Sequence, residues 1–196
     1  MAASQASKNE IVGRLFAVFR DHGFEGASIA DLSRATGLGK SSLYHYFPGG
    51  KQQMVEAVLE LATALIDSEI LSAAQLSGTL KTRTHKIAAI LDQMYAEGRV
   101  PCVLGRLAAS SIGTDAKQGL HRALKHLIEA IETLARESGM SPARARHFAE
   151  DWVARLQGAL ILQAGTGDPG PYKRTIHTLL ELSKEDALSI AGKNVS

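Results

Sequence analysis

The sequence lacks features on which several classes of protein depend. Its 196 residues include one cysteine, so no disulfide can form within the chain. Aromatic residues make up only 5% of it, with a single tryptophan. No apolar run approaches the roughly 20 residues of a membrane-spanning helix, and residues 1–7 contain no hydrophobic signal-peptide segment. These absences predict a soluble, cytoplasmic protein with no membrane partner.

Patterns for metal binding and catalysis are also missing. The chain has seven histidines, but none lies four residues from another, and no Cys-x-x-Cys motif occurs. We therefore expect no metal site. No glycine-rich phosphate loop follows a strand and Gly-x-Ser-x-Gly is absent, so we expect neither a cofactor, nor catalytic residues, nor an enzyme. The apolar neighbours of Cys102 favour an inert buried thiol, with a redox sensor as the alternative.

Helical periodicity runs through the chain, and no segment shows the alternation of a strand. The predicted fold is all-α. We expect an arm at Met1–Ser7, a loop at Ser72–Gly78 and an undecided tail from Lys184. The predicted helices span about Lys8–His22, Ser28–Gly37, Gly39–Phe47, Lys51–Leu71, Leu80–Glu97, Cys102–Ser111, Ala116–Glu137, Pro142–Ala164 and Tyr172–Ser183.

The stretch Ser28–Phe47, SIADLSRATGLGKSSLYHYF, is typical of a helix-turn-helix. Ser28 is a good N-cap, and Asp31 can complete a capping box. Gly37 is placed to end the first helix in a left-handed conformation, which glycine adopts at little cost. Leu38 is predicted to be buried in the turn between the two helices. Pro48 stops the second helix.

The second helix is predicted to expose a cation, two hydroxyls, a phenol and an imidazole within two turns. These groups are Lys40, Ser41, Ser42, Tyr44 and His45. They suit phosphate oxygens and base edges in the major groove of double-stranded DNA. An ordinary helical hairpin with a polar outer face is the alternative. The combination of cap, turn glycine, turn leucine and exposed groups favours DNA recognition.

Charge alone would not have indicated DNA binding. The whole chain has a net charge of +2, and basic and acidic residues are equal in number over residues 1–60. Nucleic-acid binding normally draws on a positive surface. The attraction must then come from the placement of single cations such as Lys40 and Lys51, and of helix N-termini near phosphates.

The run LYHYFPGGK, Leu43–Lys51, resembles the end of the signature of the TetR family of bacterial transcriptional regulators. Gly49 and Gly50 in this run resemble the LmrA/YxaF-like branch of that family. The segments Pro101–Gly105 and Gly158–Leu162 also resemble segments of that branch. The resemblance implies phosphate contacts from Tyr44, Tyr46 and Lys51, although many relatives have histidine in place of Tyr46. The predicted DNA-contact set is Ser28, Lys40, Ser41, Ser42, Tyr44, His45, Tyr46 and Lys51.

The resemblance also implies two domains, a helix-turn-helix DNA-binding domain in residues 1–50 and a helical ligand-binding and dimerisation domain in residues 51–196. It implies a homodimer formed through the last two long helices, where Leu160, Leu179 and Leu180 are expected to offer apolar surface. A small apolar or aromatic effector would release the operator DNA. Its predicted site is Leu61, Leu65, Met94, Tyr95, Phe148, Trp152 and Gln157, for which simple core packing is the alternative.

The leading prediction is therefore a ligand-responsive, dimeric transcriptional regulator, with a repressor favoured over an activator. A helical protein-interaction module that does not bind DNA is the alternative, and the presence of Lys40 and Tyr44 weighs against it. An enzyme of helical fold would need convergent acid, base or nucleophile groups, which the sequence does not show.

Overall fold

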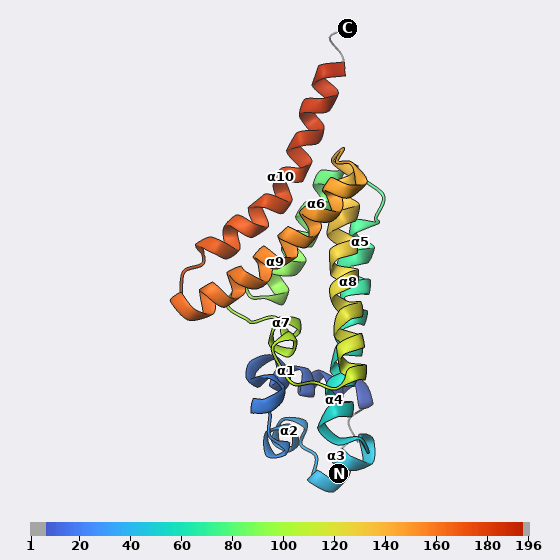
Figure 1. Ribbon diagram of the computed structural model, residues 1–196, viewed down its shortest axis with the longest axis vertical. Coiled ribbons are helices and arrows are strands. Elements are labelled where there is room, and N and C mark those ends of the chain that lie inside the picture. The colour runs from blue at the N-terminus through green and yellow to red at the C-terminus, as the bar shows by residue number, and fades with distance from the viewer. Residues whose placement is uncertain (1–6, 194–196) are drawn as a thin grey trace, which may run out of the picture. The chain divides into compact units, whose positions relative to one another are not determined.

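The computed structural model describes residues 7–193, with the backbone alone for residues 185–193, and over this range it contains helices and no strand (Figure 1). The predicted all-α fold is confirmed. The elements are α1 (Lys8–Gly26), α2 (Ile29–Thr36), α3 (Lys40–Tyr46), α4 (Gly50–Leu65), the π-helix η1 (Ile66–Leu71), α5 (Ser72–Ala74), α6 (Leu80–Met94), α7 (Val103–Ala108), α8 (Thr114–Glu137), α9 (Pro142–Thr166) and α10 (Gly170–Lys193). Within the described residues no helix is long and apolar enough to cross a membrane.

The described chain packs as two compact units. The first comprises residues 7–64 and 102–124, and the second comprises residues 65–101 and 125–193. The helix-turn-helix, α1, α7, almost all of α4 and the first part of α8 belong to the first unit. These packing units and the predicted functional domains, 1–50 and 51–196, are different divisions of the chain.

In the first unit, α1 supplies the surface on which the helix-turn-helix packs. Its buried face includes Ile11, Leu15 and Phe19, in the expected helical spacing. The sequence predicted that this helix ends at about His22, before Gly23, and this prediction is wrong. Gly23 has φ 70° and kinks the backbone, after which helical structure resumes to Gly26. Phe24 thereby stacks on Phe19, with ring centroids 6.3 Å apart.

The segment after α7 is hydrogen-bonded to the end of α1. The backbone N–H of Ser111 donates to Glu25 Oε1 at 2.5 Å, and the Ser110 hydroxyl accepts from the Phe24 N–H at 3.4 Å. The backbone hydrogen bond from Ser111 holds the pKa of Glu25 below its usual value. These bonds link sequence segments that lie far apart into one body around the helix-turn-helix.

In the second unit, α10 packs along both α6 and α9, as Figure 1 shows. Trp152 of α9 is fully buried, and its indole N–H donates to the carbonyl oxygen of Thr175 in α10 at 2.9 Å. Arg83 of α6 is buried as well. Its guanidinium donates to the carbonyl oxygen of Ala74 and pairs with Glu137 at the end of α8. The indole N–H and the terminal guanidinium nitrogens therefore have partners, whereas the buried Arg83 Nε has none among the described residues.

Several predicted boundaries are wrong. The single helix expected over Lys51–Leu71 is α4 followed by η1, in which the Ser72 N–H bonds to the Asp67 carbonyl oxygen, and helical structure continues to Ala74 in the expected loop. The helix from Leu80 ends at Met94, because Ala96 and Glu97 adopt positive φ angles of 46° and 55°. At the C-terminus, α10 continues to Lys193, beyond the predicted end at Ser183. The predicted arm lies largely in residues 1–6, outside the described residues, and Ser7 is the N-cap of α1.

Candidate nucleic-acid interface

The first helix of the motif begins at the predicted cap. The Ser28 hydroxyl accepts from the Asp31 N–H at 3.2 Å, and the Asp31 carboxylate accepts from the Ser28 N–H at 3.3 Å. The hydrogen bond from the Ser28 hydroxyl is the main cause of a lowered pKa for Asp31, and Arg34, 3.2 Å away, adds to it. A carboxylate that stays ionised in the first turn stabilises the N-terminus of α2.

The turn between α2 and α3 is built on Gly37, which adopts φ 72° and ψ 11°. Its N–H donates to the Ser33 carbonyl oxygen at 3.0 Å, which is the helix ending expected of a left-handed glycine. The Ser33 hydroxyl donates to the Leu38 carbonyl oxygen at 2.5 Å and closes the turn. Leu38 itself is only half-buried, so the prediction that it is buried between the helices is wrong. Buried Thr36 occupies the inner face of the turn instead.

A further bond fixes this turn on α1. Arg14 Nη1 donates to the carbonyl oxygen of Thr36 at 2.9 Å, so the C-terminal end of α2 is tied to the middle of α1. The last carbonyl groups of a helix lack partners within it and attract cations. This contact sets the position of α2, and through the turn the position of α3.

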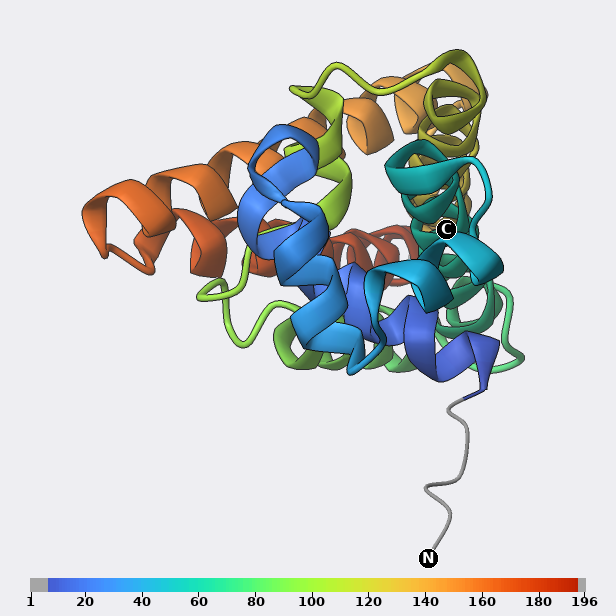
Figure 2. The same ribbon diagram turned by 90° about the horizontal axis from the view of Figure 1, so that it is seen from below.

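Helix α3 presents the predicted polar groups to solvent. Leu43 and Phe47 are fully buried and anchor the helix on its inner side. On the outer side, Lys40, Ser41, Ser42, Tyr44 and His45 are exposed, and Tyr46 is half-buried. Figure 2 shows α1, α2 and α3 from below, as the blue to cyan ribbon that begins the chain. The structure thus leaves five of the predicted contact residues exposed on α3.

The remaining two predicted contacts already have partners within the first unit. Ser28 uses its hydroxyl in the cap of α2. Lys51, in the first turn of α4, donates from Nζ to the Ala27 carbonyl oxygen at 3.1 Å and lies 4.5 Å from the centre of the Phe24 ring. Its ammonium is half-buried and joins the start of α4 to the end of α1. Lys51 therefore also has a structural role that the sequence did not reveal.

The residues predicted to bind an effector differ in how deeply they are buried. Trp152 and Tyr95 are buried, Leu61, Met94, Phe148 and Gln157 are half-buried, and Leu65 is exposed. The Gln157 Nε2 atom is buried and makes no hydrogen bond with any described residue. Two cavities of the second unit are instead lined by other residues, among them Asp92 and Tyr172 for the first and Arg155 and Leu162 for the second. No local motif in the sequence marks these residues.

A helical chain whose N-terminal helix-turn-helix exposes such groups has the fold of a DNA-binding transcriptional regulator. Residues 11–58 match the family of bacterial regulatory proteins called the tetR family. The chain is 25% identical over 188 residues to the HTH-type transcriptional regulator LmrA of Bacillus subtilis, with 91% of this chain and 97% of LmrA covered. The family match over residues 11–58 and the similarity to LmrA along most of the chain together support a transcriptional regulator of the TetR family.

Solved structures of the family have the same fold. A TetR transcriptional regulator from Legionella pneumophila superimposes with a TM-score of 0.80 at 20% identity, covering 91% of this chain and 97% of that one. A TetR-family regulator from Agrobacterium tumefaciens gives a TM-score of 0.75 at 17% identity, covering 88% and 95%. The similarity to LmrA agrees with the branch indicated by the glycines after Pro48.

Proposed function

We propose that this chain is a ligand-responsive repressor that acts in the cytoplasm, binds a palindromic operator as a homodimer and has no catalytic role. The observation that carries the proposal is the outer surface of α3. Its five exposed polar residues provide donors and acceptors for phosphates and bases, while Leu43 and Phe47 fix the helix from within. We assign DNA binding to residues 1–50, and ligand binding and dimerisation to residues 51–196.

The balanced charge of residues 1–60 makes this proposal more specific. A protein without a basic surface gains little from non-specific attraction to phosphates. Its affinity then depends on a DNA site with two half-sites on one face of the duplex. Each half-site binds the side chains of α3 from one subunit. Neutral charge therefore supports selective binding to a palindrome over general binding to duplex DNA.

The test is enrichment of operator fragments from random duplexes by the purified chain. We expect enriched palindromes to bind about 10³-fold more tightly than shuffled duplexes at physiological salt. Lys40→Ala and Tyr44→Ala should each weaken this binding by about tenfold or more, since each removes one base or phosphate contact. Ser42→Ala is the matched control on the same surface, and it should have a smaller effect. Equal affinity for enriched and shuffled duplexes would contradict the proposal.

Dimerisation is assigned to α9 and α10, as the resemblance implies, but through different side chains. Leu160 and Leu179 are buried inside the chain, so the prediction that they offer surface for a partner is wrong. Their neighbours Ile161 and Leu162 are 70% and 51% exposed. Beside them, between α9 and α10, lies a groove of about 470 Å³ lined by Gly158, Ala159 and Leu162 among others. Small residues and exposed aliphatic side chains suit the close approach of a second copy.

We assign effector binding to the second unit, at the predicted residues Leu65, Met94, Tyr95, Phe148, Trp152 and Gln157, with Gln157 as the polar anchor. Leu61, the seventh residue of the predicted set, belongs to the first unit. The buried Gln157 Nε2 without a hydrogen bond supports this role, because such a donor favours a ligand that brings an acceptor. The effector acts by binding the DNA-incompetent state more tightly. If the effector binds the DNA-incompetent state more tightly by roughly 5.5 kcal/mol, it changes the ratio of DNA-incompetent to DNA-competent protein from 1:99 to 99:1.

Operator DNA and effector should oppose each other by equal factors. An aromatic compound chosen from a small-molecule library by its quenching of Trp152, the single tryptophan, would serve as the probe. Its dissociation constant should rise in saturating operator by the factor by which it weakens operator binding, because the coupling free energy is shared. Saturating shuffled DNA is the control and should leave the constant unchanged. Identical constants with and without operator would rule out the release mechanism.

A further inference from the structure

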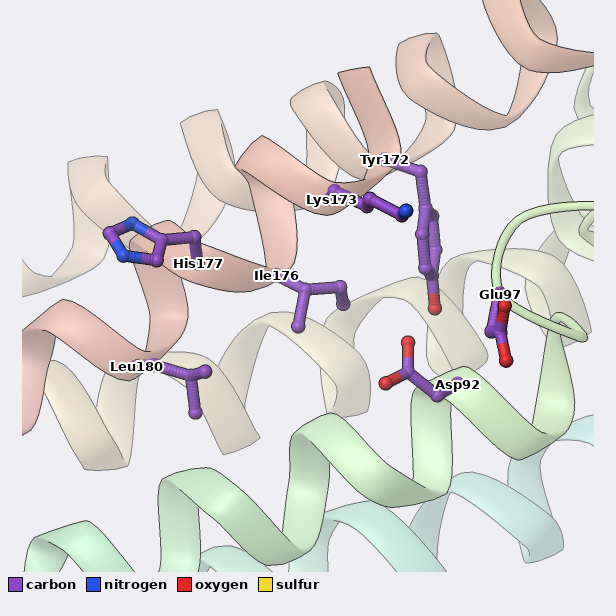
Figure 3. Close-up of a pocket in the computed structure, with 7 residues that line it drawn as sticks. All are labelled: Asp92, Glu97, Tyr172, Lys173, Ile176, His177 and Leu180. Atoms are coloured by element: carbon purple, nitrogen blue, oxygen red, sulfur yellow. The ribbon is translucent and has the colours of Figure 1, made fainter. Parts of the chain in front are cut away.

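A cavity of about 300 Å³ lies between α6 and α10 in the second unit, apart from the predicted effector residues. Figure 3 shows its walls. Asp92 comes from α6, Glu97 from the loop that follows, and the others from α10. Its lining residues are Asp92, Glu97, Tyr172, Lys173, Ile176, His177 and Leu180. The cavity therefore has an acidic and phenolic end and an aliphatic wall formed by Ile176 and Leu180.

The Tyr172 side chain marks this cavity as more than a packing defect. It is 1% exposed, and among the described residues its hydroxyl makes no hydrogen bond of ordinary geometry. A buried hydroxyl without a well-formed hydrogen bond destabilises a fold. Figure 3 shows this hydroxyl directed toward the Asp92 carboxylate. Burial, then the charge of Asp92 and a hydrogen-bonding contact with its carboxylate, raise the pKa of Tyr172, so the phenol stays neutral and its oxygen can still accept a hydrogen bond.

The charges around the cavity leave one carboxylate without a counter-ion. Asp92 is half-buried and has no ion pair among the described residues, whereas Glu97 is paired with Arg99 at 3.3 Å. His177 lies 3.2 Å from Glu181, and Lys173 is exposed, so water screens its charge. The cavity thus offers two neighbouring acceptors without a cationic partner among the described residues, the Asp92 carboxylate and the Tyr172 oxygen.

We propose that this cavity binds a protonated primary amine with a short alkyl chain. The ammonium group donates N–H hydrogen bonds to Asp92 and to the Tyr172 oxygen, with Glu97 at the same end of the cavity, and the alkyl chain lies against Ile176 and Leu180. Two hydrogen-bond acceptors require N–H donors, so a quaternary ammonium ion does not substitute. The volume is far larger than a bare metal ion needs and fits a small organic molecule. Binding at this site does not depend on DNA recognition.

The test is isothermal titration calorimetry of the full chain, without DNA, using three probes of equal chain length. Hexylammonium should bind saturably. Hexyltrimethylammonium, which keeps the charge but has no N–H, and hexanol, which has no charge, should each bind at least about tenfold more weakly. Asp92→Asn and Tyr172→Phe should each weaken hexylammonium by about tenfold. Glu69→Gln is the control, because Glu69 is an exposed carboxylate of the second unit that does not line the cavity, and this change should leave binding as it is.

Thermal unfolding separates a binding role from a structural one. Tyr172→Phe removes a buried hydroxyl that makes no hydrogen bond of ordinary geometry among the described residues, so the melting temperature without ligand should stay the same or rise. A clear fall would show that the hydroxyl supports the fold and would overturn its role as a ligand acceptor. If that variant is unfolded, half-buried Asp92→Asn decides the matter. The proposal is overturned if Asp92→Asn binds hexylammonium as tightly as the unaltered chain does. It is also overturned if all three probes bind equally, or if the unaltered chain gives no saturable heat.

Discussion

Replacing Ile161 by glutamate should convert the dimer into monomers and reduce operator affinity by at least about hundredfold. The residue is 70% exposed on α9, so the charge meets water in the monomer and leaves the fold intact. In the proposed dimer the same carboxylate would be buried in an apolar contact without a partner, which is strongly unfavourable. A monomer also loses the effective concentration that lets the second helix-turn-helix bind, which is worth about 10²–10⁴-fold. Sedimentation velocity and operator titration measure the two effects.

Leu76→Glu is the matched control, because Leu76 is another exposed aliphatic residue of the second unit, 42% exposed and outside α9 and α10. That variant should remain dimeric and keep its operator affinity. Leu179→Glu would not be informative, because Leu179 is fully buried and a charge there would unfold the chain. An Ile161→Glu protein that still sediments as a dimer would place the interface elsewhere.

The helix-turn-helix could be predicted from the sequence because its determinants are local. The Ser28 cap, the Gly37 turn and the buried positions Leu43 and Phe47 all act within a few residues, and the structure confirms each of them. At Gly23 the sequence indicates a helix end, because glycine often follows the last residue of a helix, whereas the structure has a kink there. Whether a helix resumes after it depends on tertiary contacts, here the stacking of Phe24 on Phe19 and the bond from Ser111 to Glu25.

The outer surface of α9 could not be predicted in the same way. Leu160, Ile161 and Leu162 are consecutive apolar residues, and composition does not say which of them faces inward. The direction is set by the packing of α9 against α10, where buried Trp152 donates to Thr175 and orients the helix. The cavity at Asp92 and Tyr172 was missed for a related reason. These residues are distant in sequence, and only the packing of α6 against α10 brings them together.

The loop after α6 depends on Gly98 more strictly than any sequence pattern suggests. Gly98 has φ 89°, and a Cβ atom at this position would lie 2.1 Å from Gln163 Oε1 and 2.8 Å from Tyr172 Cγ. The Gln163 amide cannot move away freely, because its Nε2 donates to the Glu97 carbonyl oxygen at 3.2 Å. The Tyr172 ring is buried on all sides. Any side chain at this position therefore displaces α10 or the loop itself.

Gly98→Ala should lower the free energy of unfolding by about 3 kcal/mol, with about 1 kcal/mol from the positive φ and the rest from overlap. For a chain of this length the melting temperature should fall by about 10 °C, measured by circular dichroism. Gly139→Ala isolates the first contribution, because Gly139 has a similar φ of 95° but nothing within 4 Å of its added Cβ. That variant should lose only about 1 kcal/mol. If the two variants melted at the same temperature, the steric overlap at Gly98 would be relieved without loss, and the close packing of the loop against Gln163 and Tyr172 would not contribute to stability.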